Sequence, residues 1–171
     1  MVKLRFFPHA MLCLLLVPVT TTLKSQDEKF KAIFIYNFTK YVEWPVKTGN
    51  FGIVILGNNA ITPELQGIAT KKTVGTNKIE VRNARTPADI GTCHILYIPS
   101  ERSDVIPQFL PRAKAEGILI VTEKQDACLQ GSCINFVNNS GKITFEISRT
   151  NIEKNGLKVS NDLIQLATNK Y

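Results

Sequence analysis

Three short, almost wholly apolar runs set the strongest constraint on how this chain can fold. They are Phe51–Leu56, Cys93–Ile98 and Gly117–Thr122, and a glycine or proline lies at or beside one end of each. A strand without polar and apolar alternation is buried on both faces, as in parallel sheets whose crossovers cover both sides. The three runs therefore predict interior strands of an α/β domain.

The segments around these runs predict the remaining elements. Phe30, Phe34, Phe38 and Tyr41 recur at helical spacing and predict a helix over Asp27–Trp44, ended by Pro45. Further elements are expected as follows: a helix starting at Thr62-Pro63-Glu64 with Thr62 as N-cap, a strand over Lys78–Arg82, a helix over Ser103–Glu116, strands Cys133–Val137 and Lys142–Ile147 around a hairpin turn, and a tail helix over Arg149–Thr168 broken at Asn155-Gly156.

Strands alternate with helices until a hairpin and a helix close the chain. This order predicts one α/β domain over residues 26–171, with a mostly parallel sheet and helices on both faces. Such a Rossmann- or flavodoxin-like three-layer fold would carry the C-terminal β-hairpin and the closing helix at one edge.

Residues 1–25 have the order of features typical of a secretory signal peptide. Lys3 and Arg5 precede an apolar stretch, and small residues follow up to Ser25, where we expect cleavage. An uncleaved anchor is the alternative, although Pro18 interrupts the stretch and its length is short for a membrane span. We therefore predict that the mature protein is exported to the periplasm.

The charge does not indicate a nucleic-acid partner. Removing Lys3, Arg5 and Lys24 with the signal lowers the formal net charge from +7 to +4. The remaining basic residues are scattered, and only Lys71 and Lys72 are adjacent, whereas a nucleic-acid surface needs a basic stripe.

The residue types needed for most catalytic or cofactor sites are scarce. Beyond the signal the only histidine is His94, inside a predicted buried strand, and we interpret it as a core residue. A triad or a zinc site needs several such side chains together. The Gly57-Asn58-Asn59 turn precedes a helix, so it is either an ordinary turn or a small-anion site. We expect no enzyme activity, no cofactor and no metal.

Two features are candidates for function. The first is the pair Cys128 and Cys133, which flank a short glycine-containing loop and are expected either to form a disulfide after export or to remain two thiols. The second is the aromatic helix, which is apolar on several faces. We select Tyr36, Tyr41, Glu43 and Trp44 as a partner surface or pocket lining; the alternative is that they only pack the fold.

Several segments, in order, resemble the YfiR family of periplasmic proteins (the DUF4154 domain). These segments are Phe34–Pro45, Phe51–Gly57, Cys93–Ile98, Gly131–Val137, Phe145–Ile147, Gly156–Ser160 and Leu163–Ala167. Together they span nearly all of the expected mature chain.

The resemblance implies a periplasmic regulator, often a dimer, that binds the sensor domain of a membrane diguanylate cyclase and holds it inactive. It also implies redox tuning through disulfides. Cys128 and Cys133 resemble the two cysteines of one family disulfide. Cys93 resembles one cysteine of a second disulfide, but residues 26–92 contain no cysteine that could be its partner.

Two function hypotheses follow. The first is a non-enzymatic regulator that binds a membrane sensor protein. The second is a periplasmic solute-binding module whose pocket lies at the carboxyl ends of the parallel strands.

Overall fold

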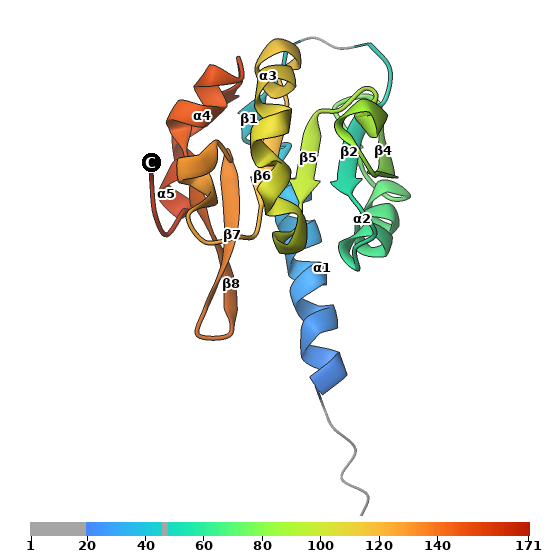
Figure 1. Ribbon diagram of the computed structural model, residues 1–171. Coiled ribbons are helices and arrows are strands. Elements are labelled where there is room, and N and C mark those ends of the chain that lie inside the picture. The colour runs from blue at the N-terminus through green and yellow to red at the C-terminus, as the bar shows by residue number, and fades with distance from the viewer. Residues whose placement is uncertain (1–19, 46–47) are drawn as a thin grey trace, which may run out of the picture.

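The architecture is that of a mixed α/β domain (Figure 1). The computed structural model describes residues 20–45 and 48–171. Most of the predicted signal segment lies outside these residues, and Thr20–Ser25 forms the first part of α1 (Thr20–Phe38). The large sheet has seven strands in the order β3-β4-β2-β5-β6-β7-β8. Their bounds are β2 (Phe51–Leu56), β3 (Thr73–Val74), β4 (Asn77–Ala84), β5 (Ile95–Ile98), β6 (Leu119–Thr122), β7 (Ile134–Asn139) and β8 (Lys142–Ile147).

The α/β class is confirmed, but the sheet is mixed. The five strands from β4 to β7 in the sheet order are parallel, whereas β3 and β8 pair antiparallel at the two edges. The crossovers after β2 and β5 contain the helices α2 (Ile61–Ala69) and α3 (Ile106–Glu116). The other two crossovers run through the single 3-10 turns η1 (Pro87–Ile90) and η3 (Ala127–Gln130). A flavodoxin-like three-layer fold would have an α-helix in each.

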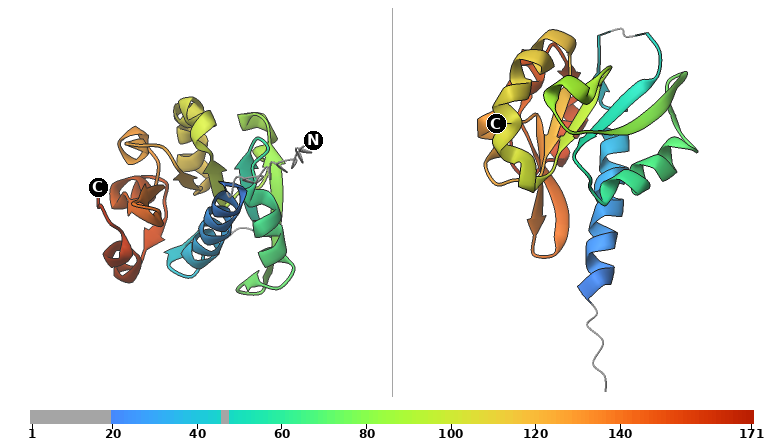
Figure 2. Two further views of the ribbon diagram at one scale, coloured as in Figure 1. Left: turned by 90° about the horizontal axis from the view of Figure 1, so that it is seen from below. Right: turned by 45° about the vertical axis from the view of Figure 1, so that its right-hand side comes forward.

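Helices cover the sheet from opposite sides (Figure 2). Helices α1 and α2 pack together on one face, and α3, preceded by the 3-10 segment η2 (Ser100–Val105), lies on the other. The chain closes with α4 (Arg149–Lys154), β9 (Lys158–Val159) and α5 (Asn161–Leu166) beside the β7–β8 hairpin. The side chain of Ser160 caps α5, accepting a hydrogen bond from the Leu163 backbone N–H.

The core is continuous and largely aliphatic, with one aromatic cluster under α1. Phe38 is fully buried, and its ring centroid lies 6.0 Å from that of Phe136 and 5.3 Å from that of Phe145. Phe34 joins the same cluster from the previous turn of the helix. The helical spacing of these phenylalanines thus produces the contact that anchors α1 to β7 and β8.

Several predicted helix boundaries are wrong. Helix α1 ends at Phe38 rather than Trp44, because the chain then turns, with the Thr39 hydroxyl donating to the Tyr36 carbonyl, and enters the two-residue strand β1 (Val42–Glu43). Strand β1 pairs antiparallel with β9, an element that the sequence did not indicate.

Helix α2 begins two residues earlier than predicted, with Ala60 at its N-cap position, and is not capped by Thr62. The Asn59 side chain accepts from the Ile61 backbone instead, while the Thr62 hydroxyl bonds to Asn83 on β4. The Thr62 hydroxyl therefore bonds to the Asn83 amide on β4 and does not cap the helix.

Candidate functional site

Helix α1 presents an uncovered apolar face in addition to its buried stripe. Phe30 and Ile33 are 46% and 41% exposed, although both side chains are large and apolar. Phe30 lines a pocket beside the β7–β8 turn with Gly141 and Ile143, whereas Ile33 lies on the side of α1 that faces α2. An exposed apolar pair on an otherwise anchored helix is typical of a contact surface.

A groove between α1 and α2 adjoins this face. It has a volume of about 540 Å³ and an apolar floor that includes Ile33, Tyr36 and Ile68. Its rim carries the lysines Lys29, Lys40, Lys71 and Lys72, with Glu64 as the one acidic lining residue. The Lys40 ammonium lies 4.9 Å from the centre of the Tyr36 ring, which orients this half-buried aromatic ring.

The other three selected residues lie away from this groove. Tyr41 and Trp44 are half-buried, and Glu43 is exposed, with its carboxylate 3.8 Å from the Lys158 ammonium across the β1–β9 pair. So exposed a pair contributes little stability. The structure thus separates Tyr36, on the α1–α2 groove, from Tyr41, Glu43 and Trp44, on or beside β1.

His94 is a core residue, as the sequence predicted. Its imidazole stacks on the Phe51 ring at a centroid distance of 4.4 Å, and Nδ1 accepts a hydrogen bond from the Gly52 backbone. The Trp44 ring packs edge-on against the Phe51 ring, with their centroids 5.0 Å apart. These contacts fix the amino ends of β2 and β5.

Cys128 and Cys133 are buried separate thiols, so the expected disulfide is not formed in this structure. Cys128 lies in η3, while the Cys133 sulfur, just before β7, accepts a hydrogen bond from the Asn155 side chain at 3.4 Å. Burial raises the pKa of each thiol to about 12, and for Cys128 the nearby Glu146 carboxylate adds to the effect.

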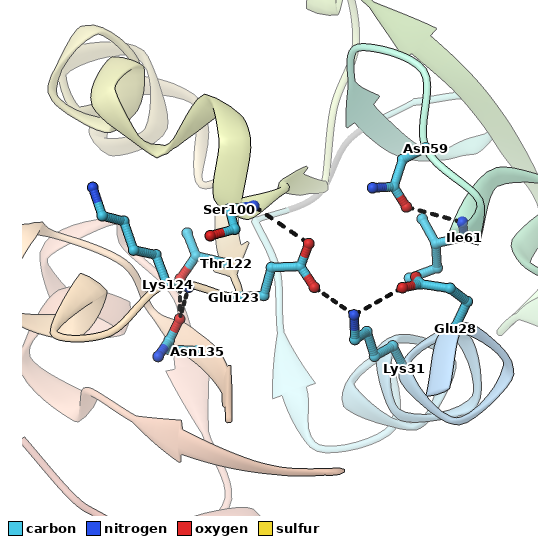
Figure 3. Close-up of polar contacts among 9 residues, drawn as sticks. All are labelled: Glu28, Lys31, Asn59, Ile61, Ser100, Thr122, Glu123, Lys124 and Asn135. Carbon is cyan, nitrogen blue, oxygen red and sulfur yellow. Dashed lines mark hydrogen bonds and ion pairs between the residues drawn. The ribbon is translucent and has the colours of Figure 1, made fainter. Parts of the chain in front are cut away.

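A buried ion group lies at the carboxyl ends of the parallel strands (Figure 3). The Lys31 ammonium on α1 donates to Glu28 Oε1 at 2.9 Å and to Glu123, which directly follows β6. Burial lowers the pKa of Lys31, but the hydrogen bonds and charges of Glu123 and Glu28 outweigh it, so the pKa is raised. This group was not predictable from local sequence, because Glu123 lies 92 positions from Lys31 and neither residue belongs to a motif.

A family model for YfiR/HmsC-like proteins (DUF4154) matches residues 28–168. The chain belongs to the YfiR/HmsC-like family. The match begins within α1 and extends past α5, so it includes both faces of the sheet. The resemblance inferred from the sequence is confirmed.

The described part of this YfiR/HmsC-like chain contains no group of three or more histidine, cysteine or acidic side chains placed to hold a metal ion. Within residues 20–45 and 48–171, no helix is both long and apolar enough to cross a membrane.

Proposed function

We propose that this YfiR/HmsC-like protein is a periplasmic, non-enzymatic regulator that binds the sensor domain of a membrane protein, such as a diguanylate cyclase. Family membership supports this class of role. The observation that carries the choice of surface is the uncovered face of α1, with Phe30 and Ile33 exposed beside a groove rimmed by lysines.

The chemistry of this surface defines the partner that it fits. Apolar side chains supply the contact area, and four lysines favour an acidic partner through electrostatic complementarity. We therefore propose that the sensor domain presents an apolar stripe with acidic neighbours. Tyr36 is the selected residue that contacts it directly.

Tyr41, Glu43 and Trp44 lie on or beside β1, where a second surface would be needed. We propose that they take part in a homodimer contact, because half-buried aromatic side chains beside a short edge strand are typical anchors of protein interfaces. Sedimentation of the wild-type protein and of Tyr41→Ala tests this role.

The regulatory role is tested by pull-down of the exported protein from native membranes, followed by a cyclase assay of the captured sensor. Ile33→Glu should weaken capture at least tenfold and relieve inhibition, because it places a carboxylate on the apolar face opposite an acidic partner. Leu129→Glu is the matched control, since Leu129 is an equally apolar side chain, 70% exposed and outside the groove. Equal capture of the wild type and Ile33→Glu would reject this surface, and failure to capture any membrane sensor would reject the role.

A further inference from the structure

A second cavity lies at the carboxyl edge of the sheet and is separate from the partner surface. It has a volume of about 560 Å³ and lies over the ends of β2 and β5. The turns Gly57–Ala60 and Pro99–Arg102 form two of its walls, and Glu28 and Lys31 of α1 with Glu123 form the third. Strands β2 and β5 are neighbours from which the chain leaves in opposite directions along the sheet, and crevices at such points commonly hold ligands.

The cavity wall contains a buried carboxylate with an unused acceptor. Glu28 is only 6% exposed, and its Oε2 has no hydrogen-bond partner, whereas its Oε1 accepts from Lys31. Leaving a buried charged acceptor unpaired is costly, so such atoms in folded proteins generally meet a ligand or an ordered water. Glu28 lines the cavity, so its carboxylate forms part of the wall that an occupant meets.

The charge balance of the buried group favours a cation. Two carboxylates, Glu28 and Glu123, share the single ammonium of Lys31, which leaves one negative charge uncompensated within the group. The Tyr97 hydroxyl, fully buried near the same two carboxylates, also lacks a partner at normal hydrogen-bond distance. The unused acceptor of Glu28 suits a donor such as an ammonium group.

Three backbone donors of the neighbouring turn are already engaged within the protein. The Gly57 backbone N–H donates to the Ala84 carbonyl, and those of Ile61 and Thr62 donate to Asn59. The anion alternative raised by the Gly57-Asn58-Asn59 sequence therefore finds these three donors already engaged. Arg102 on the opposite wall remains a basic group for an occupant that also carries a carboxylate.

We propose that this cavity binds a small organic cation through its ammonium group, with the Glu28 carboxylate as the acceptor. The cavity accommodates several non-hydrogen atoms, which suits a diamine or an amino acid. This cavity shares no lining residue with the groove between α1 and α2. Amine binding here does not depend on whether the protein regulates a membrane sensor.

Calorimetric titration of the exported protein with three probes tests the ligand class. Putrescine carries ammonium groups alone, 4-aminobutyrate carries an ammonium and a carboxylate, and butyrate carries only the carboxylate. We expect binding of at least one amine and none of butyrate. Absence of binding by both amines at millimolar concentration, or binding of butyrate as tight as that of 4-aminobutyrate, would overturn the proposal.

Two variants locate the binding. Glu28→Gln removes the charge but not the shape and should weaken amine binding at least tenfold. Glu146→Gln is the control, because Glu146 is also buried, at 8% exposure, but is bonded to Asn135 and Asn169 outside the cavity. If Glu28→Gln does not fold, Ala60→Phe fills the cavity from an exposed wall position and should abolish binding. Unchanged amine affinity in the folded Glu28→Gln or in Ala60→Phe would place the binding elsewhere and refute the site.

Discussion

The indole nitrogen of Trp44 donates a hydrogen bond to the backbone carbonyl of His94, at a distance of 3.1 Å. The same carbonyl accepts from the Leu119 backbone N–H, so this oxygen joins the segment after β1 to the starts of β5 and β6. Trp44 therefore has a packing role, whatever contact its exposed part makes with a partner.

Trp44→Phe tests this packing role. The variant keeps an aromatic ring against Phe51 but deletes the donor, and it should lower the free energy of unfolding by about 1 kcal/mol. Trp44→Ala should cost about 2–4 kcal/mol, because the ring contact is lost as well. Urea unfolding measures both, and an unchanged midpoint for Trp44→Ala would show that the indole contributes only to binding.

Phe38 and Phe34 should differ in their contribution to stability. Phe38→Ala removes a fully buried ring from the aromatic cluster and should cost about 3–5 kcal/mol, whereas Phe34 is only partly buried and its replacement should cost less. Thermal unfolding of the two variants gives the order. The reverse order would mean that the partly exposed Phe34, rather than the buried Phe38, supplies most of the anchoring of α1 on β7 and β8.

Two glycines should respond in opposite directions to a methyl group. Gly52→Ala places its Cβ against the Thr92 carbonyl oxygen beside β2, so the backbone must shift and stability must fall. Gly67→Ala, in α2, meets no atom within 4 Å and should stabilise by up to about 1 kcal/mol through helix propensity. Chemical denaturation of the pair provides the comparison, and equal effects would contradict the close approach at Gly52.

Lys31→Met should be strongly destabilising near neutral pH. It leaves Glu28 and Glu123 buried without their shared cation, at a cost of about 3–5 kcal/mol. Since the folded-state pKa of Lys31 is raised above 10.5, its stabilisation is fully present below that pH and disappears as pH rises through the folded-state value. The difference in unfolding free energy between wild type and Lys31→Met should therefore shrink above pH 10.5. Lys29→Met, which alters an exposed lysine, should show no such dependence.

The cysteines should be unreactive while the protein is folded and reduced. With pKa values of about 12, Cys128 and Cys133 carry little thiolate at pH 8, and both are buried. Iodoacetamide should label them only after unfolding in urea. The Cys128–Cys133 disulfide remains our prediction for the oxidised, exported protein, and non-reducing peptide mapping tests it; two unlinked thiols in that preparation would refute it.

The sequence predicted the elements whose signal is local. The apolar runs became β2, β5 and β6, and the Asn138–Gly141 turn joins β7 to β8, because burial on both faces and turn chemistry each leave a mark within a few residues. The two-residue strands β1 and β9 left no such mark, since their formation depends on pairing with each other.

The candidate site was only partly accessible from sequence. The several apolar faces of the first helix indicated a second contact surface, and exposed Ile33 beside Tyr36 fits that reading. Which of the helix's aromatic residues are covered depends on the position of the β7–β8 hairpin, which the sequence does not specify locally. The Glu28–Lys31–Glu123 group was invisible, because Glu123 reaches Lys31 only through the strand order of the finished sheet.

The pairing of β1 with β9 joins Val42 to Val159, near opposite ends of the chain. Whether the polypeptide emerges from a ribosome or a translocon, its first helix appears long before the residues that complete this pairing. Until β7 and β8 are made, the phenylalanines of α1 lack the strands that cover them, and they remain available to chaperones or to other nascent chains. The pairing of β1 with β9 forms later still, so a truncation before Lys158 should leave Val42 and Glu43 without their partner strand while α1 still packs on the hairpin.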